Sequence, residues 1–216
     1  MKALLFGSIG VLAETSELQR QAYNKAFKIN NLNWNWNIGT YCGMLADPGG
    51  QKRLAQFSDG ALSDTQIAKI HNDKQVVFEQ LVKNGIKPRP GCVEIIQTCR
   101  ERNIKIAFLT TTTPHTLATI TAGLADFIDF TQFDLITNMS DINQLKPDPE
   151  VFRYALTTLA ISADQAIAIE DTRSNQQAAV QAGLRCYLYP GEYAALAPDV
   201  WAEDDVIARD LGALTL

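Results

Sequence analysis

The sequence lacks the features that would indicate a membrane protein or a nucleic-acid-binding protein. No apolar run approaches the roughly 18–20 residues needed to span a bilayer, and the first ten residues break into turn residues too early for a leader. Basic residues number 19 against 24 acidic ones, and the net charge of −5 argues against binding to nucleic acid or an anionic membrane. We therefore expect a cytoplasmic protein with no nucleic-acid partner and no membrane partner.

Cysteine is also scarce, and no CxxC spacing occurs. Scattered cysteines of this kind are typical of reduced, buried thiols, so no disulfide and no zinc site is expected. The four positions are Cys42, Cys92, Cys99 and Cys186.

Two kinds of pattern divide the 216 residues. Residues 15–85 read as helical throughout: Ser16 with Gln19 and Ser63 with Gln66 have the spacing of capping boxes, and a turn at Asp47-Pro48-Gly49-Gly50 separates two of the helices. From Pro88 onward, apolar runs alternate with amphipathic helices.

The alternating part indicates a buried parallel sheet with helices on both faces. Its expected strands are Ala3–Phe6, 104–109, 133–136, Ala166–Ile169 and 185–189, with Asp148 expected to cap the helix before the fourth. The predicted fold class is α/β, a Rossmann-like doubly wound parallel sheet with an inserted all-helical cap. The expected domains are a core of residues 1–13 and 87–216 and a cap of residues 14–86.

The first strand leads into the turn Gly7-Ser8-Ile9-Gly10, and ligands bind where such a strand ends. This opening resembles that of the haloacid dehalogenase (HAD) superfamily, in which an apolar strand precedes Asp-x-Asp-Gly. Phe6 and Gly10 fit the pattern. Gly7 stands where the resemblance places the nucleophilic aspartate, and Ile9 stands where it places the acid/base aspartate.

Three later segments extend the resemblance. Thr110 and Thr111, after an apolar strand, are similar to the motif whose hydroxyl and backbone N–H groups hold the transferring phosphoryl group. Lys146, in Lys-Pro-Asp-Pro, is similar to the family's lysine, which offsets negative charge. Glu170 and Asp171, after the next strand, are similar to the acidic pair that holds Mg²⁺. The resemblance thus implies phosphate contacts at Thr110, Thr111 and Lys146.

The cap narrows the resemblance to the branch of β-phosphoglucomutase and the CbbY-like phosphatases. There, a Gly-Gly turn and the basic residues after it contact a distal phosphate. Arg53 falls on the arginine of that stretch, and an arginine fork suits bidentate phosphate recognition. Gln51 replaces a usual lysine and Gln19 a usual histidine.

Glycine offers no nucleophile and isoleucine no proton. Removing a covalent nucleophile costs on the order of 10⁴–10⁶ in rate in other enzymes. A replacement is hard to find: Ser8 should point away from the pocket because side chains alternate along extended backbone, and Glu14 is better placed for a hinge hydrogen bond. His71 and His115 read as structural or solvated.

The same substitutions affect the expected cofactor, Mg²⁺. The carbonyl of Ile9 and the side chains of Glu170 and Asp171 remain as ligands, so Mg²⁺ binding should be weak or absent. Lys146, without an aspartate to face, should pair with Asp171 or Glu170. With two carboxylates missing, the pocket should accept an anion more readily.

Two functions follow from this interpretation. The first is a catalytically impaired, phosphatase-like relative (a pseudoenzyme) that binds a small phosphorylated metabolite. The alternative is an active phosphatase of a sugar phosphate that uses a non-standard nucleophile or a metal-activated water. In a third interpretation the pocket is empty and an exposed surface serves a protein partner.

Overall fold

A computed structural model describes residues 1–45, 49–193, 205–207 and 210–214. It divides the chain into two compact units, which we call the core unit (Met1–Glu14 and Ile86–Leu216) and the helical unit (Thr15–Gly85). These boundaries differ by one residue from the domain limits expected above. Asp47 and Pro48 of the expected turn lie outside the described residues.

The core unit is built on five parallel strands in the order β3-β2-β1-β4-β5. Their bounds are β1 Ala3–Phe6, β2 Lys105–Leu109, β3 Leu135–Thr137, β4 Ala166–Glu170 and β5 Arg185–Leu188. The α/β fold class predicted from the alternating pattern is confirmed.

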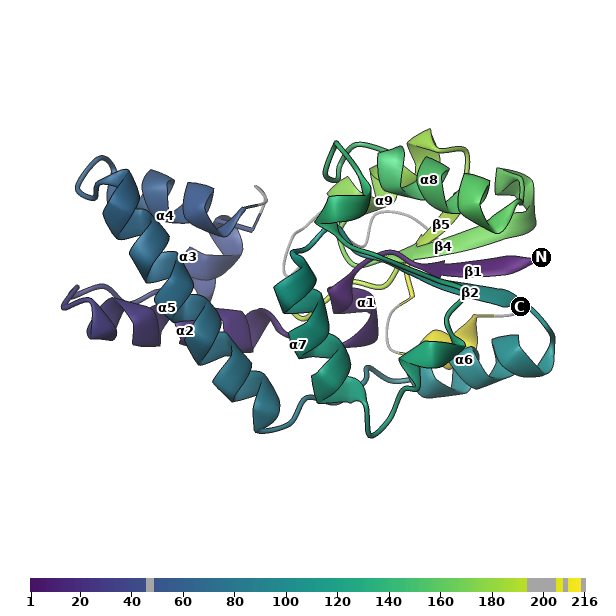
Figure 1. The fold of residues 1–216 in the computed structure, drawn as a ribbon, viewed down its shortest axis with the longest axis horizontal. Helices are drawn as coiled ribbons and strands as arrows, with labels where there is room; N and C mark the ends of the chain where they lie inside the picture. Colours follow the sequence, from purple (N-terminus) through teal and green to yellow (C-terminus); the bar gives the residue numbers. More distant parts are fainter. Residues whose placement is uncertain (46–48, 194–204, 208–209, 215–216) are drawn as a thin grey trace. The chain divides into compact units, whose positions relative to one another are not determined.

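Helices cover both faces of this sheet, with α8 and α9 on one face and α6 on the other (Figure 1). The bounds are α1 Ile9–Leu12, α6 Cys92–Glu101, α7 Pro114–Leu124, α8 Glu150–Leu159 and α9 Arg173–Gln181. Every residue of β1 is completely buried, because odd positions pack under α8 and α9 while even positions face the other layer. This explains why the strand is an uninterrupted apolar run.

The helical unit contains α2 Ser16–Ile29, α3 Ile38–Gly43, α4 Gly50–Ser58 and α5 Asp64–Lys83, so the all-helical prediction is confirmed for its described residues. An aromatic cluster fills it. Trp36 is fully buried, and its ring centroid lies 4.6 Å from that of Tyr23 and 4.8 Å from that of Phe27.

Local helix signals were right at one place and wrong at two. The capping box of Ser63 and Gln66 is present at the start of α5. The box predicted at Ser16 is absent, because α2 begins one residue earlier with Thr15 as N-cap and no side-chain cap bond. Pro149 takes the N-cap position of α8, while the Asp148 carboxylate accepts a hydrogen bond from the Glu150 backbone N–H at 2.9 Å.

Candidate functional site

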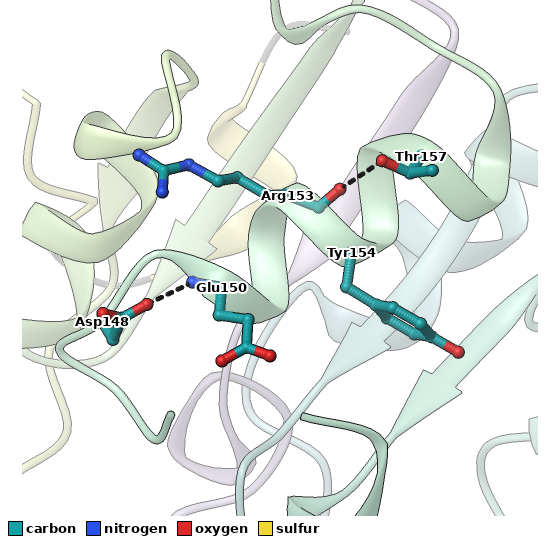
Figure 2. Close-up of a pocket in the computed structure, with 5 residues that line it drawn as sticks. All are labelled: Asp148, Glu150, Arg153, Tyr154 and Thr157. Carbon is teal, nitrogen blue, oxygen red and sulfur yellow. Dashed lines mark hydrogen bonds between the residues drawn. The ribbon is translucent and has the colours of Figure 1, made fainter. Parts of the chain in front are cut away.

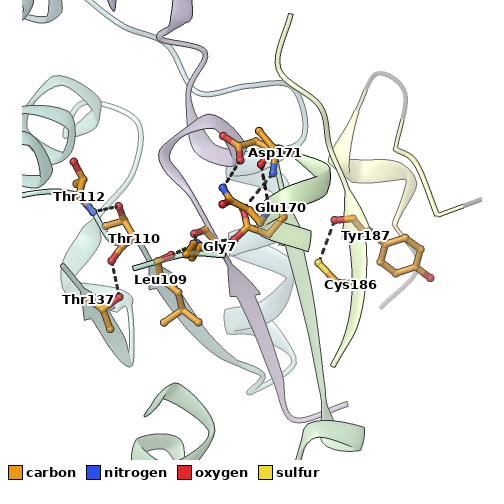
Figure 3. Close-up of polar contacts among 12 residues, drawn as sticks. Gly7, Leu109, Thr110, Thr112, Thr137, Glu170, Asp171, Cys186 and Tyr187 are labelled. Atoms are coloured by element: carbon orange, nitrogen blue, oxygen red, sulfur yellow. Dashed lines mark hydrogen bonds and ion pairs between the residues drawn. The ribbon is translucent and has the colours of Figure 1, made fainter. Parts of the chain in front are cut away.

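The candidate site lies where three neighbouring strands of the core unit end. Phe6 is in register with Phe108 on one side and with Ile169 on the other. The next residues along, Gly7, Leu109 and Glu170, therefore lie together at the carboxyl edge of the sheet (Figure 3). The Gly7 N–H continues the ladder by donating to the Ile169 carbonyl at 2.8 Å.

Lys146 reaches this edge from the loop before α8 and is almost completely buried there. Its ammonium donates to the carboxylate of Glu170 at 2.6 Å, to the carbonyl of Leu109 at 2.9 Å and to the carbonyl of Gly7. A lysine has three N–H donors, so all of them have acceptors. The expected pairing of Lys146 with a carboxylate is confirmed, and Glu170 is the partner.

The loop that carries Lys146 is fixed from outside the site. The Glu150 carboxylate accepts hydrogen bonds from the backbone N–H groups of Asn143 at 2.9 Å and Gln144 at 2.7 Å. These bonds lower the pKa of Glu150. Across the loop, the Asp148 N–H donates to the Leu145 carbonyl at 3.0 Å. The loop between 143 and 150 is thus closed on itself, which holds Lys146 inward.

Glu170 fills the space in which a side chain at position 7 would lie. A Cβ added to Gly7 would overlap Oε1 and Cδ of Glu170. Glu170 has no exposed surface, and this burial raises its pKa to about 7, while the positive charge of Lys146 acts in the opposite direction. The site is therefore a buried ion pair rather than an open carboxylate cluster.

These residues do not fit a Mg²⁺ site. The ion prefers near-ideal octahedral oxygen ligation, but one Glu170 oxygen is bound to Lys146 and the Ile9 carbonyl accepts from the Ala13 N–H at 2.9 Å. The Asp171 carboxylate accepts from Asn175 at 3.1 Å. In the described part of the chain, no group of three or more His, Cys, Asp or Glu is arranged to hold a metal.

The two threonines follow β2. Thr110 is buried; its hydroxyl accepts from the Thr112 N–H at 3.1 Å, and its carbonyl accepts from the Thr137 hydroxyl at 3.0 Å. Thr111 is half-buried. The structure thus brings Gly7, Thr110, Lys146 and Glu170 to one sheet edge, with Asp171 next to Glu170.

Arg53 belongs to the helical unit and is largely buried in α4. Its Nε donates to the Met44 carbonyl at 3.0 Å, and its guanidinium lies 5.5 Å from the centre of the Tyr41 ring. Sequence reasoning missed its neighbour Lys74, which is buried in α5. The signal was available, because Lys74 interrupts an apolar stripe of helical spacing that runs from Ile67 through Ile70 to Val77.

Lys74 donates to the side-chain oxygens of Gln19 and Gln75 and lies 5.0 Å from the centre of the Tyr23 ring. Burial, assisted by the charge of Arg53, lowers the pKa of Lys74 to about 7. Close by, a Cβ on Gly50 would lie 2.6 Å from both the His71 Nε2 and the Tyr23 hydroxyl, so a side chain at position 50 would displace these two groups. Burial lowers the pKa of His71, and the charge of Lys74 lowers it further. His71 is thus half-buried beside this cluster.

A shallow depression on α8 lies apart from this chemistry (Figure 2). Its polar groups already serve the local structure: Asp148 accepts from the Glu150 N–H, and the Thr157 hydroxyl donates to the Arg153 carbonyl at 3.0 Å. Figure 2 shows Arg153 and Tyr154 pointing in different directions. No converging set of groups marks it as a site.

Comparison with known proteins now defines the class. A family model described as haloacid dehalogenase-like hydrolase matches residues 10–189. The chain belongs to this family of phosphatase-like hydrolases, and the resemblance given by the motifs is confirmed at that level. The match begins at Gly10, so the equivalence of Gly7 and Ile9 with the family's two aspartates stays a prediction.

Particular relatives place the chain in the CbbY and phosphoglucomutase-like branch. Protein CbbY of Cereibacter sphaeroides is 34% identical over 197 residues, which cover 89% of this chain and 86% of that protein. A crystal structure of a CbbY mutant from Rhodobacter sphaeroides, in complex with xylulose-(1,5)bisphosphate, has a TM-score of 0.84 at 31% identity and covers 97% of this chain and 94% of its own. The phosphorylated carbohydrates phosphatase of Thermotoga maritima is 26% identical over 185 residues, covering 85% and 82% of the two chains.

A membrane-crossing helix is not found: no helix in the described ranges is both long and apolar enough.

Proposed function

We propose that this protein is a phosphatase-like member of its family that binds a small phosphorylated metabolite of the sugar-phosphate class and does not hydrolyse it through an aspartyl phosphate. One observation carries the proposal. Position 7 has no side chain, and the space beside it holds the Glu170 carboxylate, which is paired with Lys146. The ligand class is supported by the relatives, one of which was crystallised with a sugar bisphosphate.

The proposed phosphate contacts follow from the chemistry of the residues. Thr110 and Thr111 offer hydroxyl and backbone N–H donors at the sheet edge. Lys146 contributes positive charge there and contacts an anion directly if it exchanges one carbonyl acceptor for a ligand oxygen. In the helical unit, Arg53 offers a guanidinium fork suited to a phosphate.

Mg²⁺ binding is proposed to be weak or absent, since the residues that would hold it, Glu170 and Asp171, are engaged elsewhere. The metal normally supplies charge neutralisation to phosphoryl transfer. In this chain, Lys146 is the cation at the corresponding edge of the sheet. The cytoplasmic location stays a prediction.

The test combines turnover and binding. Sugar mono- and bisphosphates incubated with the protein and Mg²⁺ should show phosphate release lower than that of a CbbY relative by about 10⁴–10⁶-fold, because no nucleophile is present. The same compounds should raise the thermal midpoint, since a ligand at 100 times its Kd adds about 2.7 kcal/mol to the free energy of unfolding. Turnover comparable with that relative contradicts the proposal.

An active phosphatase with a non-standard nucleophile is the alternative. Ser8 is adjacent to position 7, and its buried hydroxyl lies beside the Glu170 carboxylate: burial raises the pKa of Glu170, while hydrogen bonding to Ser8 lowers it. That carboxylate is already paired with Lys146, whereas an activated serine needs a base that is free to take its proton. Mass spectrometry of the protein after incubation with a sugar phosphate decides between the two: a covalent phospho-adduct on any side chain supports the alternative. A protein partner on an exposed surface is favoured only if no phosphate compound shifts the thermal midpoint.

A further inference from the structure

The Lys146–Glu170 pair is unusual in how completely it excludes water. The Lys146 side chain is 4% exposed and that of Glu170 is 0% exposed. Burial of either charge alone is costly, and a buried pair persists only when each member has its partner and its remaining hydrogen bonds. Here the backbone carbonyls of Gly7 and Leu109 accept the other two hydrogen bonds of the Lys146 ammonium.

Gly7 is what allows Glu170 to reach this position. Its φ does not lie in the left-handed region that favours glycine, so its backbone conformation is open to other residues. Instead, a Cβ at position 7 would overlap the Glu170 carboxylate in its present position. A side chain at position 7 therefore requires the end of the Glu170 side chain to move, whereas the backbone conformation itself is open to other residues.

We propose that Glu170 is the permanent counter-ion of Lys146, occupying the space and supplying the charge of a carboxylate at position 7, so that the core unit holds no divalent cation. The lack of fit to Mg²⁺ is then a consequence of the ion pair: the carboxylate that would ligate the metal neutralises a lysine. This role depends on the contacts of Lys146 and not on which metabolite the protein binds.

The first experiment needs no variant. The thermal midpoint of the full chain is measured in millimolar MgCl₂ and in NaCl of matched ionic strength. We expect equal midpoints in the two salts. A resident site at 100 times its Kd would raise the midpoint by about 5–10 °C, and a saturable rise of that kind overturns the proposal.

The second experiment is a suppressor cycle made of Gly7→Asp, Glu170→Ala and the double variant. Gly7→Asp alone should lower the midpoint because the new side chain collides with Glu170. Glu170→Ala alone should lower it by about 6–20 °C because it leaves Lys146 buried and unpaired. The double variant should melt above either single variant, since the aspartate then pairs with Lys146 in the space that Glu170 has left.

Gly43→Asp is the matched control, because it adds the same side chain where no atom lies within 4 Å of the new Cβ. If the midpoint of the double variant falls by as much as the two single losses added together, or by more, the counter-ion role is overturned. If Glu170→Ala does not fold, Glu170→Gln replaces it: retention of shape and loss of charge should still lower the midpoint, and an unchanged midpoint overturns the role. Neither experiment measures phosphate binding or turnover, so failure of the proposed function leaves both results interpretable.

Discussion

In the described part of the chain, each unit buries one lysine, and the two are treated differently. Lys146 in the core unit faces a carboxylate and two backbone carbonyls. Lys74 in the helical unit donates to the amide oxygens of Gln19 and Gln75 and lies near the rings of Tyr23 and Phe78. The charge of Lys146 is thus neutralised inside the core unit, whereas these contacts of Lys74 are with neutral side chains.

The comparison of the two lysines indicates which of them attracts an anion more strongly. An ammonium already paired with a carboxylate offers a phosphate little additional attraction. A buried lysine with neutral partners and an arginine nearby is stabilised in its charged form by an incoming anion. We therefore expect a bound phosphate to raise the pKa of Lys74 more than that of Lys146, because Lys146 already has a carboxylate partner.

The largest expected effect comes from removing each lysine in turn. Lys146→Met should cost about 3–5 kcal/mol of unfolding free energy, because the carboxylate of Glu170 is left buried without its partner. Lys74→Met should be near neutral or stabilising, since an apolar side chain of similar length replaces a cation that burial disfavours. Urea unfolding at a fixed pH near 8 measures both.

Equal losses in the two methionine variants would break the comparison, because they would show that Lys74 is as strongly compensated as Lys146. Lys69→Met is the control for a lysine in an exposed pair, whose contact with Asp73 spans 2.9 Å on the surface of α5. Its loss should be under about 1 kcal/mol.

The next effect is a pH dependence that belongs to Lys74. Its pKa is about 7 in the folded chain and 10.5 in the unfolded chain, so the unfolded state holds the proton more tightly across that range. Stability from this group is therefore present at high pH and is lost as the pH falls toward 7. Between pH 7 and 9 it should contribute about 2–3 kcal/mol.

The measurement is the difference in unfolding free energy between the native chain and Lys74→Met at several pH values, which cancels the other titrating groups. We expect the native chain to gain on the variant as the pH rises. A difference that does not change with pH would show that the buried ammonium keeps its ordinary pKa.

Whether a structural feature could be predicted from the sequence depends on how far apart along the chain its interacting residues lie. The strands and the helical segment were predictable because apolar spacing is local, and the Ser63–Gln66 box was predictable because its partners are three residues apart. The Ser16 box failed because Thr15 begins the helix one residue earlier, a choice that sequence spacing alone does not decide.

The site divided in the same way. The order of the motifs predicted that Gly7, Lys146 and Glu170 lie at one edge of the sheet, because the carboxyl ends of parallel strands meet at the same edge. What the sequence left open was which of two adjacent carboxylates Lys146 would select, since that depends on the volume vacated at position 7. Lys74 was missed because a lysine within an apolar stripe is usually assigned to the exposed flank of a helix.

A third prediction concerns ligand affinity. Arg53→Lys keeps the charge but loses the planar fork, so the Kd for a sugar phosphate should rise about 10- to 100-fold, as expected for loss of charge-assisted hydrogen bonds. Isothermal titration gives the Kd. Lys69→Met, which removes an exposed cation of α5, is the control and should change the Kd little. An unchanged Kd in Arg53→Lys would show that Arg53 does not contact the phosphate.

The smallest effect on phosphate affinity should come from Asp171, the carboxylate next to Glu170. Asp171 is partly exposed and accepts a hydrogen bond from Asn175, and Asp171→Asn keeps that acceptor while removing one negative charge. Because solvent screens a partly exposed charge, phosphate affinity should rise by only a few-fold. Titrations with and without Mg²⁺ should agree. If affinity instead falls, and falls only when Mg²⁺ is present, a metal links Asp171 to the phosphate, and the contrast between a neutralised core unit and a cationic helical unit fails.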